Sequence, residues 1–118
     1  MTAPTGSTID RATFEALKET TGAEFVLELV DTFLQEAPAM LDELRRTLAA
    51  KDADKFRRTA HSLKSNSNTF GALTLGAMAR ELELTSAAKV SAGGAAAVDA
   101  LADEYSRVAA ALTALRHA

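Results

Sequence analysis

The residues best placed to do chemistry lie in one segment, from Lys55 to Ala72, which reads KFRRTAHSLKSNSNTFGA. Apolar or small residues recur there at steps of three and four, the spacing of one helix face: Phe56, Ala60, Leu63, Ser67 and Phe70. At about 100° per residue, His61 lies about 140° from the centre of this stripe. The spacing therefore predicts a solvent-facing imidazole that a group outside the chain can reach.

The side chains one helical turn from His61 supply positive charge and little bulk. Arg57 precedes it by four residues, and Lys64 and Ser65 follow it by three and four. An ammonium group at Lys64 is in position to pair with a phosphoryl oxygen attached to the imidazole. On an arbitrary helix, a solvated surface histidine beside a solvated lysine is the more common case. The residues alone leave both interpretations open.

The composition excludes several other kinds of site. The 118 residues contain no cysteine and only two histidines, His61 and His117, which removes thiolate catalysis, cysteine zinc sites and multi-histidine metal sites. We identify no Gly-rich phosphate loop or acidic metal cluster, so we expect no bound cofactor or metal. A net charge of −3 and a pI near 5.3 argue against nucleic-acid binding. No apolar run approaches the roughly 20 residues that span a bilayer, and we expect a cytoplasmic protein without membrane contact.

The composition predicts an all-α fold. Alanine and leucine dominate, and no stretch alternates with period two. We expect residues 1–9 to form a flexible N-terminus ahead of a single domain over residues 10–118. Asp10 is placed to cap a short first helix that ends near Gly22. The long second helix, residues 23–50, keeps its apolar stripe in phase across Pro38, which favours one kinked helix over two.

Three further helices follow along the chain. Asp52 is the expected cap of the helix that carries His61, Gly71 ends it, and the next helix is predicted over residues 72–88. The Gly93–Gly94 pair predicts a break at KVSAGG, after which a last helix carries an apolar stripe as far as Leu115. Four substantial helices joined by short turns predict an antiparallel up-down four-helix bundle, with the short additional N-terminal helix at one end.

The segment AHSLKSNSNTFGA resembles the signature of the histidine-containing phosphotransfer (HPt) domain, in which an Ala-His-x-Leu-Lys core leads to a Gly-Ala turn. The similarity extends outward, to the acidic turn at Asp52 on one side and to Leu75, Leu82 and Glu83 on the other. It covers approximately residues 10–115, and the fold of that family is the helical bundle inferred above.

The resemblance implies a phosphoryl carrier of a two-component phosphorelay, without ATP-dependent kinase activity of its own. Nε2 of His61 would accept a phosphoryl group from the aspartate of one response-regulator receiver domain and pass it to another. Mg²⁺ would belong to the receiver, and a hybrid histidine kinase is a further expected partner. Lys64 would offset charge on the phosphoryl oxygens. The family is usually monomeric, and we expect a monomer here.

Two further sets of residues complete the expected site. In a hairpin that turns at Gly71, the level of His61 falls near residues 81–83, where the Glu83 carboxylate would hold Nδ1–H and fix the tautomer. The alternative for Glu83 is a solvated charge at the helix edge. Many relatives have glycine in place of Ser65, which bears on how a partner docks. The residues expected to form the docking surface are Arg57, Arg58, Ser65, Asn68 and Gly76.

Two other functions stay open at this point. One is the phosphoryl-accepting domain of a chemotaxis-type histidine kinase, which a longer parent chain would favour. The other is an adapter that binds receivers without carrying phosphoryl groups. The intact pair of His61 and Lys64 argues against the adapter.

Overall fold

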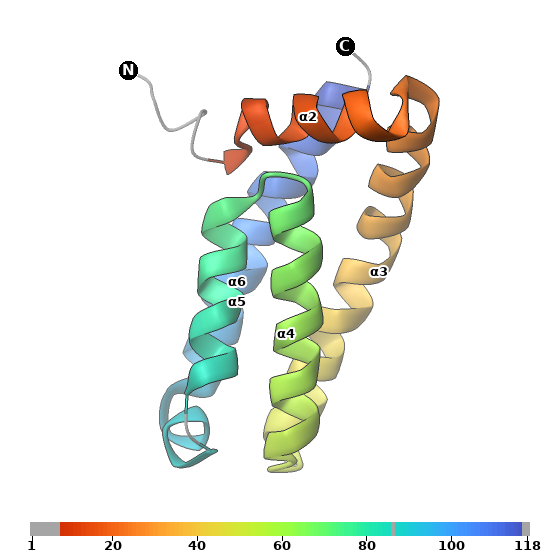
Figure 1. Ribbon diagram of the computed structural model, residues 1–118. Helices are drawn as coiled ribbons and strands as arrows, with labels where there is room; N and C mark the ends of the chain where they lie inside the picture. Colours follow the sequence, from red (N-terminus) through yellow and green to blue (C-terminus); the bar gives the residue numbers. More distant parts are fainter. Residues whose placement is uncertain (1–7, 86, 117–118) are drawn as a thin grey trace.

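The computed structural model describes residues 8–85 and 87–116, and it is helical throughout, without a strand in the described part (Figure 1). The helices labelled in Figure 1 are α2 (Arg11–Thr21), α3 (Ala23–Ala49), α4 (Ala53–Thr69), α5 (Leu73–Leu84) and α6 (Ala87–Arg116). The predicted all-α class is confirmed. His117, which the sequence left without a role, lies outside the described residues.

Side-chain caps start two of the helices as predicted. A carboxylate oxygen of Asp10 accepts a hydrogen bond from the Thr13 amide at 3.0 Å, and Asp52 accepts one from the Lys55 amide at 3.1 Å. Each aspartate thereby satisfies an amide that has no partner within its helix. The Asp52 cap marks the start of α4, the helix that carries His61.

Helix α3 runs unbroken through Pro38, so the prediction of one helix rather than two is confirmed. Proline has no N–H, and the carbonyl of Leu34, four residues earlier, loses its helical donor. The Tyr105 hydroxyl on α6 donates a hydrogen bond to that carbonyl at 3.3 Å. A side chain from a neighbouring helix therefore replaces the missing backbone donor.

A tight turn joins α4 to α5. The Ala72 amide donates to the Ser67 carbonyl at 2.9 Å and the Gly71 amide to the Asn68 carbonyl at 3.1 Å, the two bonds of a Schellman motif. Gly71 has φ +87°, and a Cβ there would lie 2.7 Å from the Asp10 carbonyl oxygen. The Asp10 amide also donates to the Gly71 carbonyl at 2.7 Å. Glycine is required here both for its backbone angle and for this close approach.

The predicted break at KVSAGG is wrong. Helix α5 ends at Leu84, where Thr85 turns to an extended conformation, and α6 begins at Ala87 and continues through Gly93 and Gly94. Each glycine in a helix costs about 1 kcal/mol relative to alanine. Alanines surround the pair, and the next turns bury Val98 and Leu101 completely, so helix propensity and burial together outweigh that cost.

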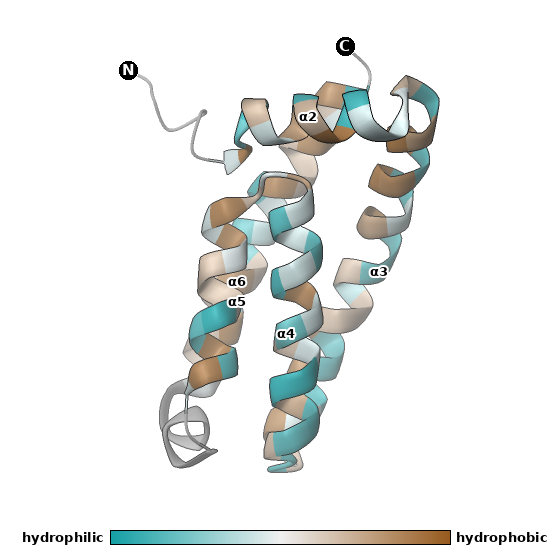
Figure 2. Cartoon of the chain, viewed as in Figure 1, coloured by the Kyte–Doolittle hydropathy of each residue, from teal (hydrophilic) through white to brown (hydrophobic). Residues whose placement is uncertain are grey.

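The four longer helices pack side by side, α3 against α4 and α6, and α5 against α4 and α6, while α2 crosses one end over α3 and α4 (Figure 1). Brown apolar segments of Figure 2 recur along these helices. The largest fully buried side chains are Phe56, Leu44, Leu63, Leu75, Leu101, Leu112, Val26, Val30, Val98, Val108 and Ser67. In the described part of the chain, no helix is both long and apolar enough to cross a membrane.

Two residues depart from their expected environment. Ile9, assigned from the sequence to the flexible N-terminus, has 3% of its surface exposed and packs in the core. The packed region therefore begins before residue 10, while residues 1–7 lie outside the described part. Ser67 fills a fully buried position in the α4 stripe, where its hydroxyl has no hydrogen-bond partner. This supports its assignment as a small packing residue.

Candidate functional site

The imidazole of His61 projects from the middle of α4 into solvent. Its side chain is 55% exposed, as the helical spacing predicted, because the opposite face of α4 buries Phe56, Ala60 and Leu63. The only ring atom with a short contact among the described residues is Nδ1, which lies 2.6 Å from Oε2 of Glu83. Nε2 therefore remains the ring nitrogen available to an incoming group.

Glu83 comes from the last turn of α5, on the helix that returns beside α4. The α4–α5 turn brings it opposite His61, and its side chain is only 15% exposed. Its Oε1 lies 3.0 Å from Nζ of Lys64. The two groups form an ion pair. One carboxylate thus joins the two residues of α4 that the sequence had singled out.

Electrostatics keep this carboxylate charged. The Lys64 ammonium and, secondarily, the His61 ring hold the pKa of Glu83 below its ordinary value, against a smaller opposing effect of burial. An ionised Glu83 can only accept, so Nδ1 must carry the hydrogen in this contact. That tautomer leaves the lone pair of Nε2 free to attack an electrophile.

A shallow hollow of about 380 Å³ adjoins the exposed side of the ring. It is lined by Arg57, Arg58, His61, Ser62 and Glu83. The two arginines share Asp54, with Arg57 Nη2 2.9 Å from Oδ1 and Arg58 Nη2 3.1 Å from Oδ2. All three side chains are more than half exposed, and the two guanidinium groups lower the pKa of Asp54. The hollow is therefore lined by two guanidinium groups as well as by the carboxylate of Glu83.

The remaining predicted docking residues lie along the C-terminal half of α4 and the facing turn of α5. Ser65 and Asn68 are exposed. Gly76 is buried. The Asn68 side chain lies so close to it that a Cβ at this position would be 2.0 Å from Oδ1 of Asn68. Gly76 therefore has little surface of its own within the predicted docking face. Its lack of a side chain instead lets the Asn68 amide lie against α5.

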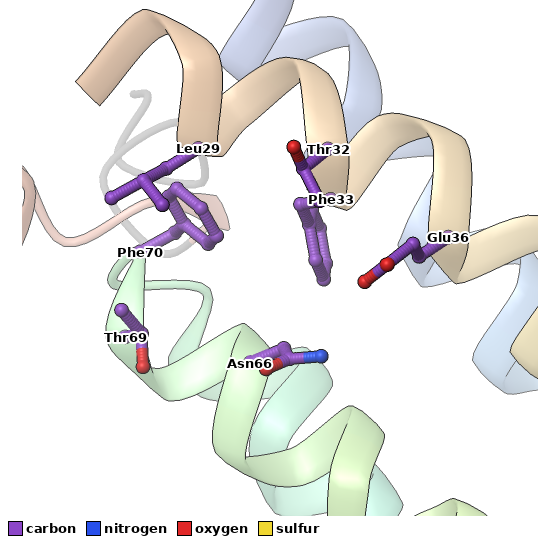
Figure 3. Close-up of a pocket in the computed structure, with 7 residues that line it drawn as sticks. All are labelled: Leu29, Thr32, Phe33, Glu36, Asn66, Thr69 and Phe70. Carbon is purple, nitrogen blue, oxygen red and sulfur yellow. The ribbon is translucent and has the colours of Figure 1, made fainter. Parts of the chain in front are cut away.

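A second hollow, of about 140 Å³, opens between α3 and α4, and the sequence did not predict it (Figure 3). Its lining residues are Leu29, Thr32, Phe33, Glu36, Asn66, Thr69 and Phe70. The rings of Phe33 and Phe70, two of its lining residues, lie 5.2 Å apart. No sequence signal marks it, because it depends on how far apart α3 and α4 lie.

The described residues offer no metal site: they contain no group of three or more histidine, cysteine, aspartate or glutamate side chains that could hold an ion. Glu83 is the nearest acidic group to His61, and it already has two partners.

Comparison with known proteins identifies the family. The model of the Hpt domain family matches residues 28–118, and the chain belongs to that family. Among solved structures, it is similar to the crystal structure of histidine-containing phosphotransfer protein B (HptB) from Pseudomonas aeruginosa PAO1. The two share 29% sequence identity over 98% of this chain and 97% of that one, with a TM-score of 0.86. No curated protein sequence matches.

The resemblance found in the sequence is therefore confirmed, and the chain is a histidine phosphotransfer protein of a phosphorelay. The family match includes the whole of α4 and α5, and so every residue that meets at the site.

Proposed function

We propose that His61 is the phosphoryl acceptor, and that this chain carries the group between receiver domains without kinase activity of its own. The observation that carries the proposal is the 2.6 Å contact between Nδ1 of an exposed histidine and the Glu83 carboxylate. It fixes which nitrogen is free, and it does so on the motif by which the sequence resembles the family.

Phosphoryl transfer to His61 is a displacement at phosphorus. The Nε2 lone pair of His61 forms the N–P bond as the P–O bond to the receiver aspartate breaks, and that electron pair leaves on the aspartate carboxylate. The Nδ1 hydrogen stays on the ring, and the adjacent Glu83 carboxylate offsets the positive charge that the ring acquires. The reverse step, toward a second receiver, uses the same contacts. This chain contributes the position and the charge of the nucleophile. Mg²⁺ on the receiver would neutralise the charge on the phosphoryl group during transfer.

Lys64 contributes through Glu83 in the unphosphorylated protein. Its ammonium lies against Oε1, so it holds the carboxylate in place beside the ring. Charge compensation of the phosphoryl oxygens, expected from the sequence, requires this ion pair to open or to be shared.

We further propose how the helices are arranged and where the protein acts. The four longer helices form an antiparallel up-down bundle, with α2 as the additional N-terminal helix. Two ion pairs between α3 and α6 support opposite directions for these helices, because the earlier residue of α3 pairs with the later residue of α6: Asp31 with Arg116 at 2.7 Å, and Arg45 with Asp99 at 2.6 Å. We take the protein to act as a cytoplasmic monomer on receiver domains and a hybrid histidine kinase, through the face around His61.

The test is phosphotransfer from a panel of receivers, each prephosphorylated with a small-molecule donor. Wild type and His61→Gln run side by side, and the label is tested for acid lability, which distinguishes phosphohistidine from phosphoserine. Acid-labile label on wild type alone is the expected result. Binding of receivers without label on either protein would contradict the proposal and favour the adapter.

A further inference from the structure

The charges around His61 are unequally distributed. Lys64 and Glu83 form an ion pair that is neutral as a unit, with side chains 23% and 15% exposed. Arg57, Arg58 and Asp54 form a second cluster, in which two cations share one carboxylate and one positive charge is left over. A phosphoryl group attached to His61 adds up to two negative charges at this surface. The uncompensated positive charge therefore lies on the arginine side of the ring.

The arginines are also on the correct side of the helix. Arg57 and Arg58 precede His61 by four and three residues, so all three side chains share a face of α4. Helical side chains lean toward the N-terminus, which places the imidazole over the turn that carries the arginines. Both arginines line the hollow beside the ring, together with His61 itself.

Their release from Asp54 requires little energy. Arg57 and Arg58 are 54% and 64% exposed and Asp54 is 64% exposed, and ion pairs between such side chains contribute at most about 1 kcal/mol. The Lys64–Glu83 pair, by contrast, is mostly buried and also orients the ring. A guanidinium group moreover presents paired donors that match two phosphoryl oxygens.

From these contacts we infer that Arg57 and Arg58 bind the phosphoryl group carried by His61. In the unphosphorylated state the two arginines form ion pairs with Asp54 instead. The inference rests on the proposed function of His61, and it replaces the role in partner docking expected for the two arginines. Asp54 acts as a competitor: its carboxylate and the phosphoryl oxygens seek the same guanidinium groups.

An equilibrium measurement separates this role from docking. Contacts made only in the complex with a receiver change the forward and reverse transfer rates equally and leave the equilibrium constant unchanged. Contacts to the phosphoryl group on the free phosphorylated protein shift the equilibrium constant itself. The readout is thus the ratio of phosphorylated to unphosphorylated protein after equilibration with one receiver. The rate at which phosphotransfer reaches this equilibrium is measured as well.

The variants are Arg57→Gln, Arg58→Gln, the double variant Arg57→Gln/Arg58→Gln, and Asp54→Asn. Arg45→Gln is the matched control, because Arg45 is a 46% exposed arginine paired with an exposed aspartate on another face. Each single arginine variant should lower the equilibrium constant for accepting phosphoryl about threefold, and the double variant about tenfold. Asp54→Asn should raise it about threefold, since it releases both arginines. The control should match wild type, and thermal unfolding should show every variant folded.

Unchanged equilibrium constants in the double variant would overturn the inference, whether or not the rates fall; slower rates alone would return the arginines to docking. A decrease rather than an increase for Asp54→Asn would also contradict it. Failure of the proposed function gives a different result, in which wild type itself acquires no acid-labile label.

Discussion

A single carboxylate organises the chemistry at the scale of individual residues. Glu83 accepts from Nδ1 of His61 with one oxygen and faces Lys64 with the other. Without it, the ring would be free to rotate about its exposed side-chain bonds, and the hydrogen would distribute between both nitrogens. Glu83 therefore positions the nucleophile, and Lys64 positions Glu83.

Substitution of Glu83 tests this hierarchy. Glu83→Ala removes both contacts and should slow phosphotransfer about 10- to 100-fold, the range seen when metal-bound histidines lose the partner that orients them. Glu83→Gln should lose less, because its amide oxygen still accepts from Nδ1–H. The measurement is the single-turnover rate of labelling by a phosphorylated receiver. Glu81→Gln, an exposed neighbour on α5, is the control, and equal rates for Glu83→Ala and wild type would refute the role.

The lowered pKa of Glu83 predicts a pH dependence of stability. Lys64 and His61 favour the ionised carboxylate in the folded state, so its folded pKa lies below its unfolded one. The resulting stabilisation is complete above the unfolded pKa, near 4, and is lost as pH falls through the folded value. Melting temperatures of wild type and Glu83→Gln should therefore differ at pH 6 and converge as pH is lowered below about 4. A gap that persists at pH 2 would show that the carboxylate's charge is not its source.

At the scale of elements, α3 depends on α6 for a hydrogen bond that its own sequence cannot provide. The Tyr105 hydroxyl donates to the Leu34 carbonyl, which Pro38 leaves without a helical donor. Burial raises the pKa of Tyr105 further above neutrality, which extends the pH range in which its hydroxyl can donate. A proline is thereby tolerated within a long helix.

A double-mutant cycle measures this exchange of donors. Tyr105→Phe alone should lower the free energy of unfolding by about 1 kcal/mol, because the Leu34 carbonyl loses its partner. In a Pro38→Ala background the backbone amide of the introduced alanine supplies the helical bond, and the same change should cost less. Urea unfolding of the four proteins gives the coupling energy. A cost for Tyr105→Phe that is unchanged by Pro38→Ala would mean that the hydroxyl does not compensate for the proline.

The sequence predicted those features of the fold that depend on residues close together in the chain. Asp10, Asp52 and Gly71 mark helix ends by hydrogen bonds or backbone angles within a few positions, and the structure has each of them. The break predicted at the Gly93–Gly94 pair was wrong. The low helix propensity of glycine costs less free energy than burial of the following turns gains.

The site shows the same division. Helical spacing alone placed His61 outward, and hairpin geometry brought Glu83 within reach of it. The pairing of Lys64 with Glu83, and the Asn68 side chain over Gly76, depend on interhelical distance, which no local pattern encodes. Nor does any local pattern show that Tyr105 meets Leu34 across 71 positions.

At the scale of the whole molecule, α3 and α6 contribute to the core but carry none of the residues of the site. Helices α3 and α6 bury long apolar stripes against the other helices, and two ion pairs join α3 to α6. The site residues all belong to α4 and α5. Stability and chemistry should therefore respond to different substitutions.

Substitutions in α6 test this separation. Leu112→Ala removes a fully buried side chain and should cost 2–5 kcal/mol, roughly the range for such changes in other cores. Arg116→Gln, which breaks a partly exposed ion pair with Asp31, should cost no more than about 1 kcal/mol. Denaturant unfolding gives both values. Phosphotransfer per folded molecule, measured well below the melting temperature, should equal wild type in both, and a slowed Leu112→Ala would show that the core and the site are coupled.

The turn at Gly71 makes one unbroken stretch, from Asp54 to Glu83, the source of every group assigned to the chemistry. Contacts within such a hairpin are close in sequence, and local contacts form early and with little loss of chain entropy during folding. The reactive arrangement can thus assemble before α6 closes over the core. Because α2, α3 and α6 contribute no side chain to the reactive group, substitutions on the exposed faces of these helices should leave its geometry unchanged.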